Sequence, residues 1–245
     1  MNLYIDVGNT AIKFGVEYKD AVELVFTMST SEGIKNPEGV LGYLPGPISH
    51  VYISSVVPAA SESLGKLFGA DVPVTFISPL DDSGVQVKID YPEELGTDLL
   101  CDIAAANKIF GYPSLIVDLG TATKFILIDE NGVFSTCAIV PGIELSLNTL
   151  SKNTALLPRI DIQEIKPLLE CHNTVDVLMA SAYYSHIDMI NGLVKRYEDE
   201  VGYDIQVILT GGNLDFIKEQ LNFEYKFKYN LCLQGIKVIA DKKGE

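Results

Sequence analysis

The feature that most constrains the fold is a short segment that occurs twice. Leu3-Tyr4-Ile5-Asp6-Val7-Gly8-Asn9 is an apolar run with an aspartate near its end, followed by glycine and a small polar residue. Leu115-Ile116-Val117-Asp118-Leu119-Gly120-Thr121 has the same design 112 residues later. After each copy comes a second apolar run that carries a lysine and a phenylalanine. Two copies separated by 112 residues indicate a duplicated domain rather than a solenoid. We therefore predict two related halves, 1–111 and 112–245.

Both halves are expected to begin with a β-hairpin, because turn residues such as Gly8-Asn9-Thr10 separate two short apolar runs. Strands and helices then alternate, which predicts an α/β fold with mixed sheets. The predicted strands are 3–7, 12–16, 22–28, 50–57, 74–77, the apolar run of the repeat that begins at Leu115, the run that carries Lys124 and Phe125, about 133–140, and 205–209. The predicted helices follow Pro58, span 95–110, begin near 143, span 174–200 and follow Gly212.

The charge balance excludes two classes of partner. With 18 basic and 33 acidic residues the formal charge is −15, so nonspecific attraction to nucleic acid or to an anionic membrane is not expected. No apolar run approaches membrane-spanning length, and residues 1–6 offer no basic leader. The four cysteines form no C-x-x-C pair, which favours isolated buried thiols over zinc. These observations predict a cytoplasmic protein.

The repeated strand and turn have a chemical interpretation. A glycine after the strand lets backbone N–H groups approach a phosphate, and an aspartate at the strand end can hold a hydrated cation or activate water. Two such loops facing each other across a cleft would hold a nucleoside triphosphate from both sides. A single copy is equally well explained as an ordinary hairpin turn. Thr210-Gly211-Gly212 is a third glycine turn, and it is a candidate cradle for adenosine or simply a common strand–helix turn.

Other residues are expected to be structural. His50, His172 and His186 lack metal-ligand spacing and are expected at the surface or hydrogen-bonded to partners. The segment 81–83 is expected to be a loop, and the lysine-rich segment 241–245 a solvated tail. The chain contains no Walker A, G-x-G-x-x-G or G-x-S-x-G motif, which excludes P-loop, Rossmann and α/β-hydrolase interpretations.

Taken together, the motifs resemble the superfamily of acetate and sugar kinases, heat-shock ATPases and actin, and within it the type III pantothenate kinases. The matching segments run in family order along nearly the whole chain: Asp6-Val7-Gly8-Asn9-Thr10 with Lys13, Ser54-Ser55-Val56-Val57-Pro58, Pro92 to Asp98, Asp118 to Thr123, Pro141-Gly142-Ile143, Leu157-Pro158, Asn173-Thr174 and Thr210-Gly211-Gly212. The resemblance implies duplicated ribonuclease H-like (actin-like ATPase) halves and a homodimer. It also implies ATP-dependent phosphorylation of pantothenate, the first step of coenzyme A synthesis.

The resemblance implies a role for each matching residue. Asp98 would be the general base, and Asp118 would bind a monovalent cation, K⁺ or NH₄⁺. Mg²⁺ would accompany ATP. The residues implied to contact ATP are Asp6, Val7, Gly8, Asn9, Thr10, Ala11, Ile12, Lys13, Thr121, Gly211 and Gly212. The residues implied to contact pantothenate are Tyr91, Gly96, Thr97, Asp98, Leu99 and Thr174, the last across the dimer interface.

Several positions depart from the family pattern. Leu99 stands where arginine is usual, Lys124 where threonine is usual, and Ile126 where aspartate is usual. In the long helix, Ser181-Ala182 stands where Ser-Gly is usual. Leucine cannot make the charge-assisted contacts of arginine with a carboxylate or phosphate. Two alternatives therefore stay open: a nucleotide-binding accessory protein with impaired catalysis, and a related kinase for another small hydroxyl substrate.

Overall fold

A computed structural model describes residues 1–160 and 164–244. Contacts divide the chain into two compact units. Unit 1 comprises 1–114, 126–136 and 228–245, and unit 2 comprises 115–125 and 137–227. The predicted boundary near 111 remains a prediction.

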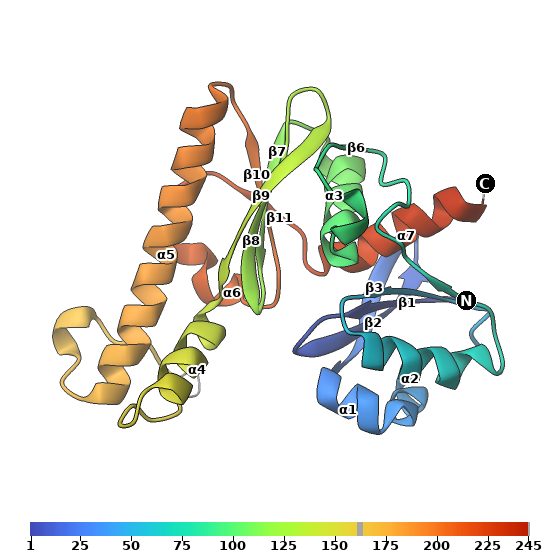
Figure 1. Cartoon of the computed structure of the whole chain (residues 1–245), viewed down its shortest axis with the longest axis horizontal. Coiled ribbons are helices and arrows are strands. Elements are labelled where there is room, and N and C mark those ends of the chain that lie inside the picture. Colours follow the sequence, from blue (N-terminus) through green and yellow to red (C-terminus); the bar gives the residue numbers. More distant parts are fainter. Residues whose placement is uncertain (161–163, 245) are drawn as a thin grey trace. The chain divides into compact units, whose positions relative to one another are not determined.

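The elements are coloured by sequence in Figure 1. The strands are β1 (Asn2–Val7), β2 (Ala11–Tyr18), β3 (Ala21–Ser29), β4 (His50–Ser55), β5 (Val74–Phe76), β6 (Gln86–Val87), β7 (Ser114–Leu119), β8 (Ala122–Ile128), β9 (Val133–Pro141), β10 (Gln206–Thr210) and β11 (Lys226–Phe227). The α-helices are α1 (Thr30–Lys35), α2 (Pro58–Gly69), α3 (Thr97–Phe110), α4 (Ile143–Asn153), α5 (Thr174–Val201), α6 (Leu214–Ile217) and α7 (Leu231–Gly244). Four 3-10 helices lie at Pro37–Tyr43, Pro92–Glu94, Leu168–Glu170 and Lys218–Gln220.

Unit 1 is built on a five-stranded sheet of order β3-β2-β1-β4-β5. β1 and β2, and β2 and β3, pair antiparallel, whereas β4 lies parallel to β1 and to β5. The predicted opening hairpin and the mixed sheet are therefore confirmed. Helices α1 and α2 cover one face of this sheet, and α3 and α7 cover the other (Figure 1).

The alternation of side chains along β1 explains this arrangement. Leu3, Ile5 and Val7 point into a cluster of buried apolar residues shared with α2. Tyr4 and Asp6 point to the opposite face, where α3 and α7 lie, because side chains alternate along a strand. The ionisable side chain at the end of β1 is thereby directed away from the main apolar cluster.

Residues 241–244 are exposed, as a solvated segment requires, but they form the last turn of α7 and not a free tail. Lys242 and Lys243 bind Asp82 and Asp81 at 3.0 and 2.7 Å, so the segment is held to the loop at 81–83. The middle of α7 is buried, and Gln234 exchanges two hydrogen bonds with the backbone of Val22, at 3.0 and 2.6 Å. This helix is a structural part of unit 1.

Two cysteines match the expectation of free, buried thiols: Cys101 on α3 and Cys232 on α7 are both buried, whereas Cys137 and Cys171 are half-buried. A hydrogen bond with Cys101, together with burial, raises the pKa of the Cys232 thiol well above its ordinary value. None of the four cysteines, all of which lie in the described ranges, is in a disulfide.

In the order of pairing, the second sheet is β11-β10-β7-β8-β9-β6. Within unit 2, α5 packs on it through the buried His186, which forms a 2.9 Å hydrogen bond with Thr123 on β8. Burial lowers the pKa of His186. On the same helix, the Tyr183 hydroxyl donates to the carbonyl of Phe216 on α6 at 3.2 Å. As predicted, the histidines bind structural partners where they are buried.

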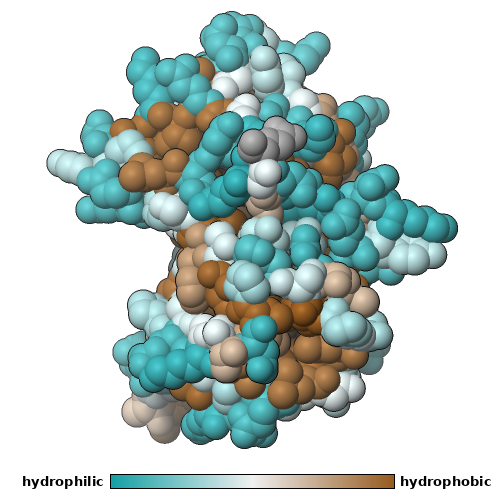
Figure 2. All heavy atoms as spheres, turned by 90° about the vertical axis from the view of Figure 1, so that its right-hand side faces the viewer, coloured by the Kyte–Doolittle hydropathy of each residue, from teal (hydrophilic) through white to brown (hydrophobic). Residues whose placement is uncertain are grey.

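Hydrophobic side chains also reach the surface. Figure 2 shows brown apolar areas between teal polar ones on the face that it presents. Scattered exposure of this kind is ordinary for a globular protein. In the described part of the chain, no helix combines the length and apolar composition needed to cross a bilayer.

Candidate active site

The edge of the unit 1 sheet aligns three polar residues from neighbouring strands. Asp6 on β1 is the register partner of Lys13 on β2 and of Ser54 on β4. Register partners point to the same face of a sheet, so the three side chains form a row. Lys13 Nζ lies 4.0 Å from Asp6 Oδ2, and the two side chains are 26% and 13% exposed. The row places a positive and a negative charge at the ends of these strands.

The turn that follows β1 is held by its own backbone and by α1. Gly8 N donates to the carbonyl of Ala11 at 3.0 Å. Thr30, the first residue of α1, donates its hydroxyl to the carbonyl of Gly8 at 2.7 Å and its N–H to that of Thr10 at 3.0 Å. Thr30 is buried, and the sequence analysis did not identify it. The turn residues Asn9 and Thr10 remain exposed, as a phosphate-binding loop requires.

Helix α3 begins beside this row. The buried hydroxyls of Ser54 and Thr97 form a 2.9 Å hydrogen bond, and Thr97 also donates to the carbonyl of Ser55. Asp98 therefore lies in the first turn of a helix whose Thr97 is hydrogen-bonded to Ser54, the register partner of Asp6. The N-terminal end of a helix stabilises a carboxylate through the helix dipole. The structure thus brings the predicted base and the first predicted phosphate loop to one edge of unit 1.

A pocket of about 570 Å³ lies at the same end of β4 and β5. Gly96 and Thr97 line it together with apolar residues, among them Phe76 and Leu95, and with the polar residues Ser55 and Ser61. Small-molecule sites commonly lie beyond the carboxyl ends of parallel strands and combine an apolar wall with a few polar groups. Two of the residues predicted to contact substrate therefore line a pocket of suitable size and chemistry.

The other predicted substrate residues of unit 1 differ in exposure. Tyr91 is 62% exposed, just before the 3-10 helix that leads to Gly96. Leu99 is 7% exposed, so it is part of the packing of α3. Its side chain offers the site no charge.

Unit 2 contains the second hairpin. Gly120 N donates to the carbonyl of Ala122 at 3.2 Å, whereas the first hairpin joins Gly8 to Ala11. The second turn is therefore one residue shorter. Lys124 Nζ lies only 2.7 Å from Asp118 Oδ2, and both side chains are 15% exposed.

Two further turns meet the second hairpin. Gly142 N, just before α4, donates to the carbonyl of Thr121 at 2.9 Å, and Asn213 N, just before α6, donates to that of Leu119 at 2.9 Å. Gly211 has φ +101, and a Cβ there would collide with the backbone of Leu119. Glycine is required at this position both for its backbone conformation and for the close approach. The third predicted glycine turn is thus packed directly on the second hairpin, as a nucleotide cradle would need.

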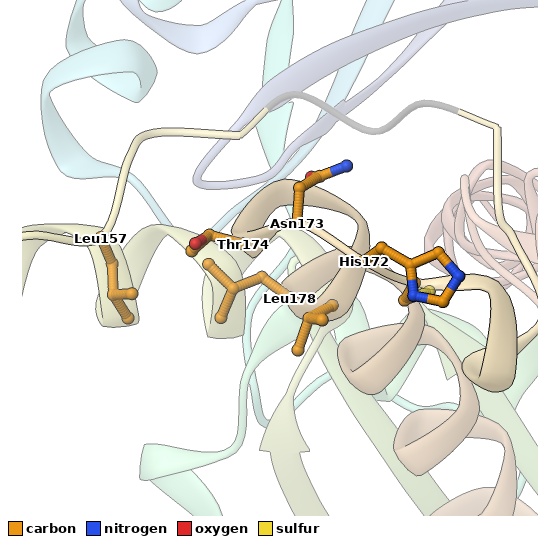
Figure 3. A pocket seen from close by; sticks show the side chains of 7 residues that line it. Leu157, His172, Asn173, Thr174 and Leu178 are labelled. Atoms are coloured by element: carbon orange, nitrogen blue, oxygen red, sulfur yellow. The ribbon is translucent and has the colours of Figure 1, made fainter.

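Thr174 is the first residue of α5 and is exposed beside a second pocket, of about 480 Å³. Figure 3 shows Thr174 with Leu157, Asn173 and Leu178, which also line it. Asn173 caps the helix by accepting from Asp176 N at 3.0 Å.

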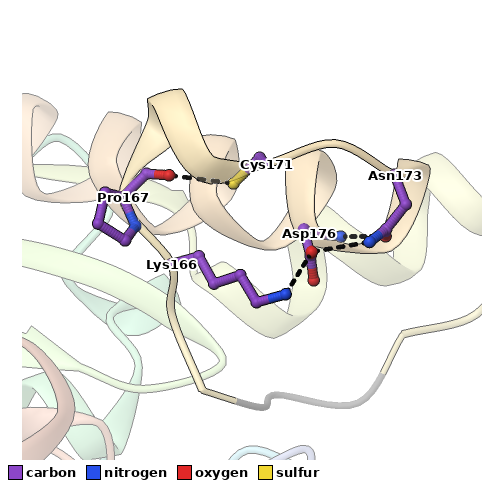
Figure 4. A network of polar contacts seen from close by, with 5 residues as sticks. All are labelled: Lys166, Pro167, Cys171, Asn173 and Asp176. Atoms are coloured by element: carbon purple, nitrogen blue, oxygen red, sulfur yellow. Dashed lines mark hydrogen bonds and ion pairs between the residues drawn. The ribbon is translucent and has the colours of Figure 1, made fainter.

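A polar network fixes the start of α5 (Figure 4). Lys166 and Asn173 both donate to Asp176 Oδ2 at 2.7 Å. The hydrogen bond from Lys166 holds the pKa of Asp176 below its ordinary value. Thr174 therefore stands on a helix end with a defined position within unit 2.

The sequence analysis missed residues whose hydrogen bonds and ion pairs connect one element of the site to the next. Ser54 was identified only as part of a motif, although its hydroxyl connects β4 to α3. The ion pair of Lys124 was also missed, and its signal was the spacing of the hairpins: Asp6 and Lys13 are seven positions apart, Asp118 and Lys124 six.

Comparison with known proteins shows the family of the chain. The sequence profile of type III pantothenate kinases matches residues 2–196. A type III pantothenate kinase from Acholeplasma laidlawii is 35% identical over 249 residues, covering 99% of both chains. Those from Brevibacillus brevis and Halalkalibacterium halodurans are 30% and 31% identical, again with 99% of both chains covered.

Solved structures support the fold alone. A Campylobacter jejuni structure described as a Baf family transcriptional activator superposes with a TM-score of 0.62 at 20% identity, covering 99% of this chain and 98% of the other. A structure described as a 2-dehydro-3-deoxygalactonokinase from Sinorhizobium meliloti has a TM-score of 0.56 at 12% identity, with 99% of each chain covered.

The sequence matches define a phosphotransferase, and the solved structures that share its fold support the predicted α/β architecture with two sheets flanked by helices. Within that class, the chain belongs to the type III pantothenate kinase family.

Proposed function

We propose that this chain transfers the γ-phosphoryl group of ATP to the primary hydroxyl of pantothenate. Membership of the family supports the activity, because its relatives along the full chain are named for it. The observation that carries the proposal for this chain's own residues is the row of Lys13, Asp6 and Ser54, joined through Thr97 to the first turn of α3. It places a phosphate loop and a candidate base on neighbouring elements of one unit.

Phosphoryl transfer depends mainly on charge neutralisation and positioning. In a chain of net charge −15, the N–H groups of the first hairpin and the ammonium of Lys13 would hold phosphate oxygens. Asp6 fits Mg²⁺, since one carboxylate at a strand end plus substrate phosphates is a common Mg²⁺ environment. When bound there, Mg²⁺ would neutralise charge on the phosphates.

Asp98 is the proposed general base. Its carboxylate would accept the proton of the attacking hydroxyl while Gly96 and Thr97 position pantothenate at the pocket that they line. Tyr91 and Leu99 belong to the same proposed substrate side, Leu99 through packing. On the ATP side, the proposal assigns Thr121, Gly211 and Gly212 of unit 2 to nucleotide contact.

The homodimer and the contact of Thr174 with pantothenate across it are part of the same proposal, as is the cytoplasm as compartment. The pocket beside Thr174 and the exposure of Leu156 and Leu169, at 92% and 93%, are consistent with a covered surface in unit 2. Analytical ultracentrifugation of the purified chain tests the dimer. A mass of 26.8 kDa, that of one chain, at all concentrations would contradict it.

A coupled assay of ADP release tests the proposed activity. With ATP and Mg²⁺, we expect turnover that requires pantothenate and saturates with it. Turnover only with a different alcohol would instead identify a related kinase. Nucleotide binding without turnover on pantothenate would identify an accessory protein with impaired catalysis.

A further inference from the structure

The carboxylate that the family resemblance assigns to a monovalent cation already has a cation beside it. Lys124 Nζ lies 2.7 Å from Asp118 Oδ2, a distance typical of a charge-assisted hydrogen bond. Both side chains are only 15% exposed, so water screens this pair less than a surface pair.

The first hairpin provides an internal comparison. There the corresponding pair, Lys13 and Asp6, is separated by 4.0 Å, and the lysine is 26% exposed. In each hairpin the lysine is opposite its aspartate: Lys13 pairs with Asp6, and the shorter turn from Gly120 to Ala122 places Lys124 opposite Asp118 in the same way. Only in unit 2 does the lysine closely neutralise the carboxylate.

The surroundings of Asp118 do not favour a second cation. A further positive ion at this carboxylate would face the ammonium of Lys124 at short range, and like charges repel strongly where exposure is low. The nearby carbonyls of Gly120 and Thr121 already accept hydrogen bonds from Asn213 Nδ2 and Gly142 N. The residues present therefore do not fit a bound K⁺ or NH₄⁺ at Asp118.

Lys124 also lies close to Cys137 on β9. Burial raises the pKa of the Cys137 thiol, and the charge of Lys124 opposes that rise. The thiol is thus kept neutral, and it does not supply a second negative charge that could hold an additional cation.

We infer that the ammonium of Lys124 takes the place of the monovalent cation at Asp118, so that this chain needs neither K⁺ nor NH₄⁺. The part of this inference that concerns turnover rests on the proposed function. The part that concerns ion binding rests on the ion pair alone.

The kinetic test compares the chain in KCl and in tetramethylammonium chloride at equal ionic strength. We expect the rate of pantothenate phosphorylation to differ by less than about twofold between the two salts. Lys124→Thr removes the ammonium, so we expect it to lose at least about tenfold in tetramethylammonium and to recover in KCl or NH₄Cl. The matched control is Lys195→Met, which breaks an exposed lysine–aspartate pair on α5 and should behave as the unmodified chain in both salts.

An ion-binding measurement tests, independently of turnover, whether a monovalent cation binds at Asp118. Crystals soaked in Rb⁺ should show no anomalous scattering at Asp118 in the unmodified chain, whereas Lys124→Thr should show a peak there. If Lys124→Thr does not fold, Lys124→Met serves, because it retains the length of the stem and removes the charge. A Rb⁺ peak at Asp118 in the unmodified chain, or activation of that chain by K⁺ of tenfold or more, would overturn the inference. If the unmodified chain shows no turnover and no Rb⁺ peak at Asp118, the proposed kinase activity is contradicted and the ion-binding inference is supported.

Discussion

Replacing Asp98 with asparagine is expected to lower kcat for pantothenate phosphorylation by about 10²–10⁴-fold, the usual contribution of a general base. Asparagine has nearly the same shape and can occupy the first turn of α3, but its amide cannot accept the substrate proton. Because Ser54 and Thr97 anchor this turn, the fold should be retained. Nucleotide affinity, measured by calorimetry, should change by less than about twofold.

Glu94→Gln is the matched control for Asp98→Asn. Glu94 is an exposed carboxylate in the segment just before α3, so neutralising it changes the same local charge without touching the base. We expect less than a twofold change in kcat for this variant. The base assignment would fail if Asp98→Asn kept more than a tenth of the activity, or if it lost nucleotide affinity as severely as it lost turnover.

The second large effect concerns stability. Gly235→Ala is expected to lower the free energy of unfolding by about 3 kcal/mol or more, or to prevent folding. In α7 the backbone at Gly235 lies directly on the backbone of Cys101 in α3, and a Cβ there would overlap the Cys101 carbonyl, far inside the 3.0 Å that real Cβ atoms keep. Backbone cannot rotate away as a side chain can, so the two helices would have to separate.

Urea unfolding measures this effect against a control in another helix. Gly192 lies inside α5, and a Cβ there would meet nothing within 4 Å. Gly192→Ala should therefore raise the free energy of unfolding by about 0.5–1 kcal/mol, as expected for alanine in an open helical position. Equal stability of the two variants would contradict the close packing of α3 and α7.

The sequence predicted the elements around the repeat well because their signals are local. Alternating apolar residues and turn glycines determine both hairpins. Gly111 ends α3 with φ +76, and Asn173 caps α5, as residues of these types commonly do. The start of α3 was placed two residues early, since Leu95 continues the apolar pattern although the chain at that point is extended.

The role of α7 was not predictable from local signals. In the sequence, the polar end of this helix has the composition of a solvated tail. Only the three-dimensional fold brings Lys242 and Lys243 to Asp82 and Asp81. The same holds for the bond between Ser54 and Thr97, which connects residues 43 positions apart. Such contacts depend on strand register and helix packing, which composition and periodicity do not specify.

The residues of the candidate site were predicted through the resemblance, and the structure supplies their connections within each unit. Asp6, Lys13 and Asp98 were named from motifs, but their common location follows from the pairing of β1 with both β2 and β4. Lys124 was noted as a departure from the family. Its significance depends on its close contact with Asp118, which only the structure shows.

The central claim is that this chain makes a phosphate ester at the primary hydroxyl of pantothenate, and detection of the product tests it most directly. In ³¹P–¹H correlation NMR of a reaction with ATP, Mg²⁺ and pantothenate, we predict a new phosphorus signal coupled to the methylene protons beside that hydroxyl. It should grow in step with ADP and be absent with Asp98→Asn. Inorganic phosphate appearing with ADP while pantothenate stays unmodified would contradict the account.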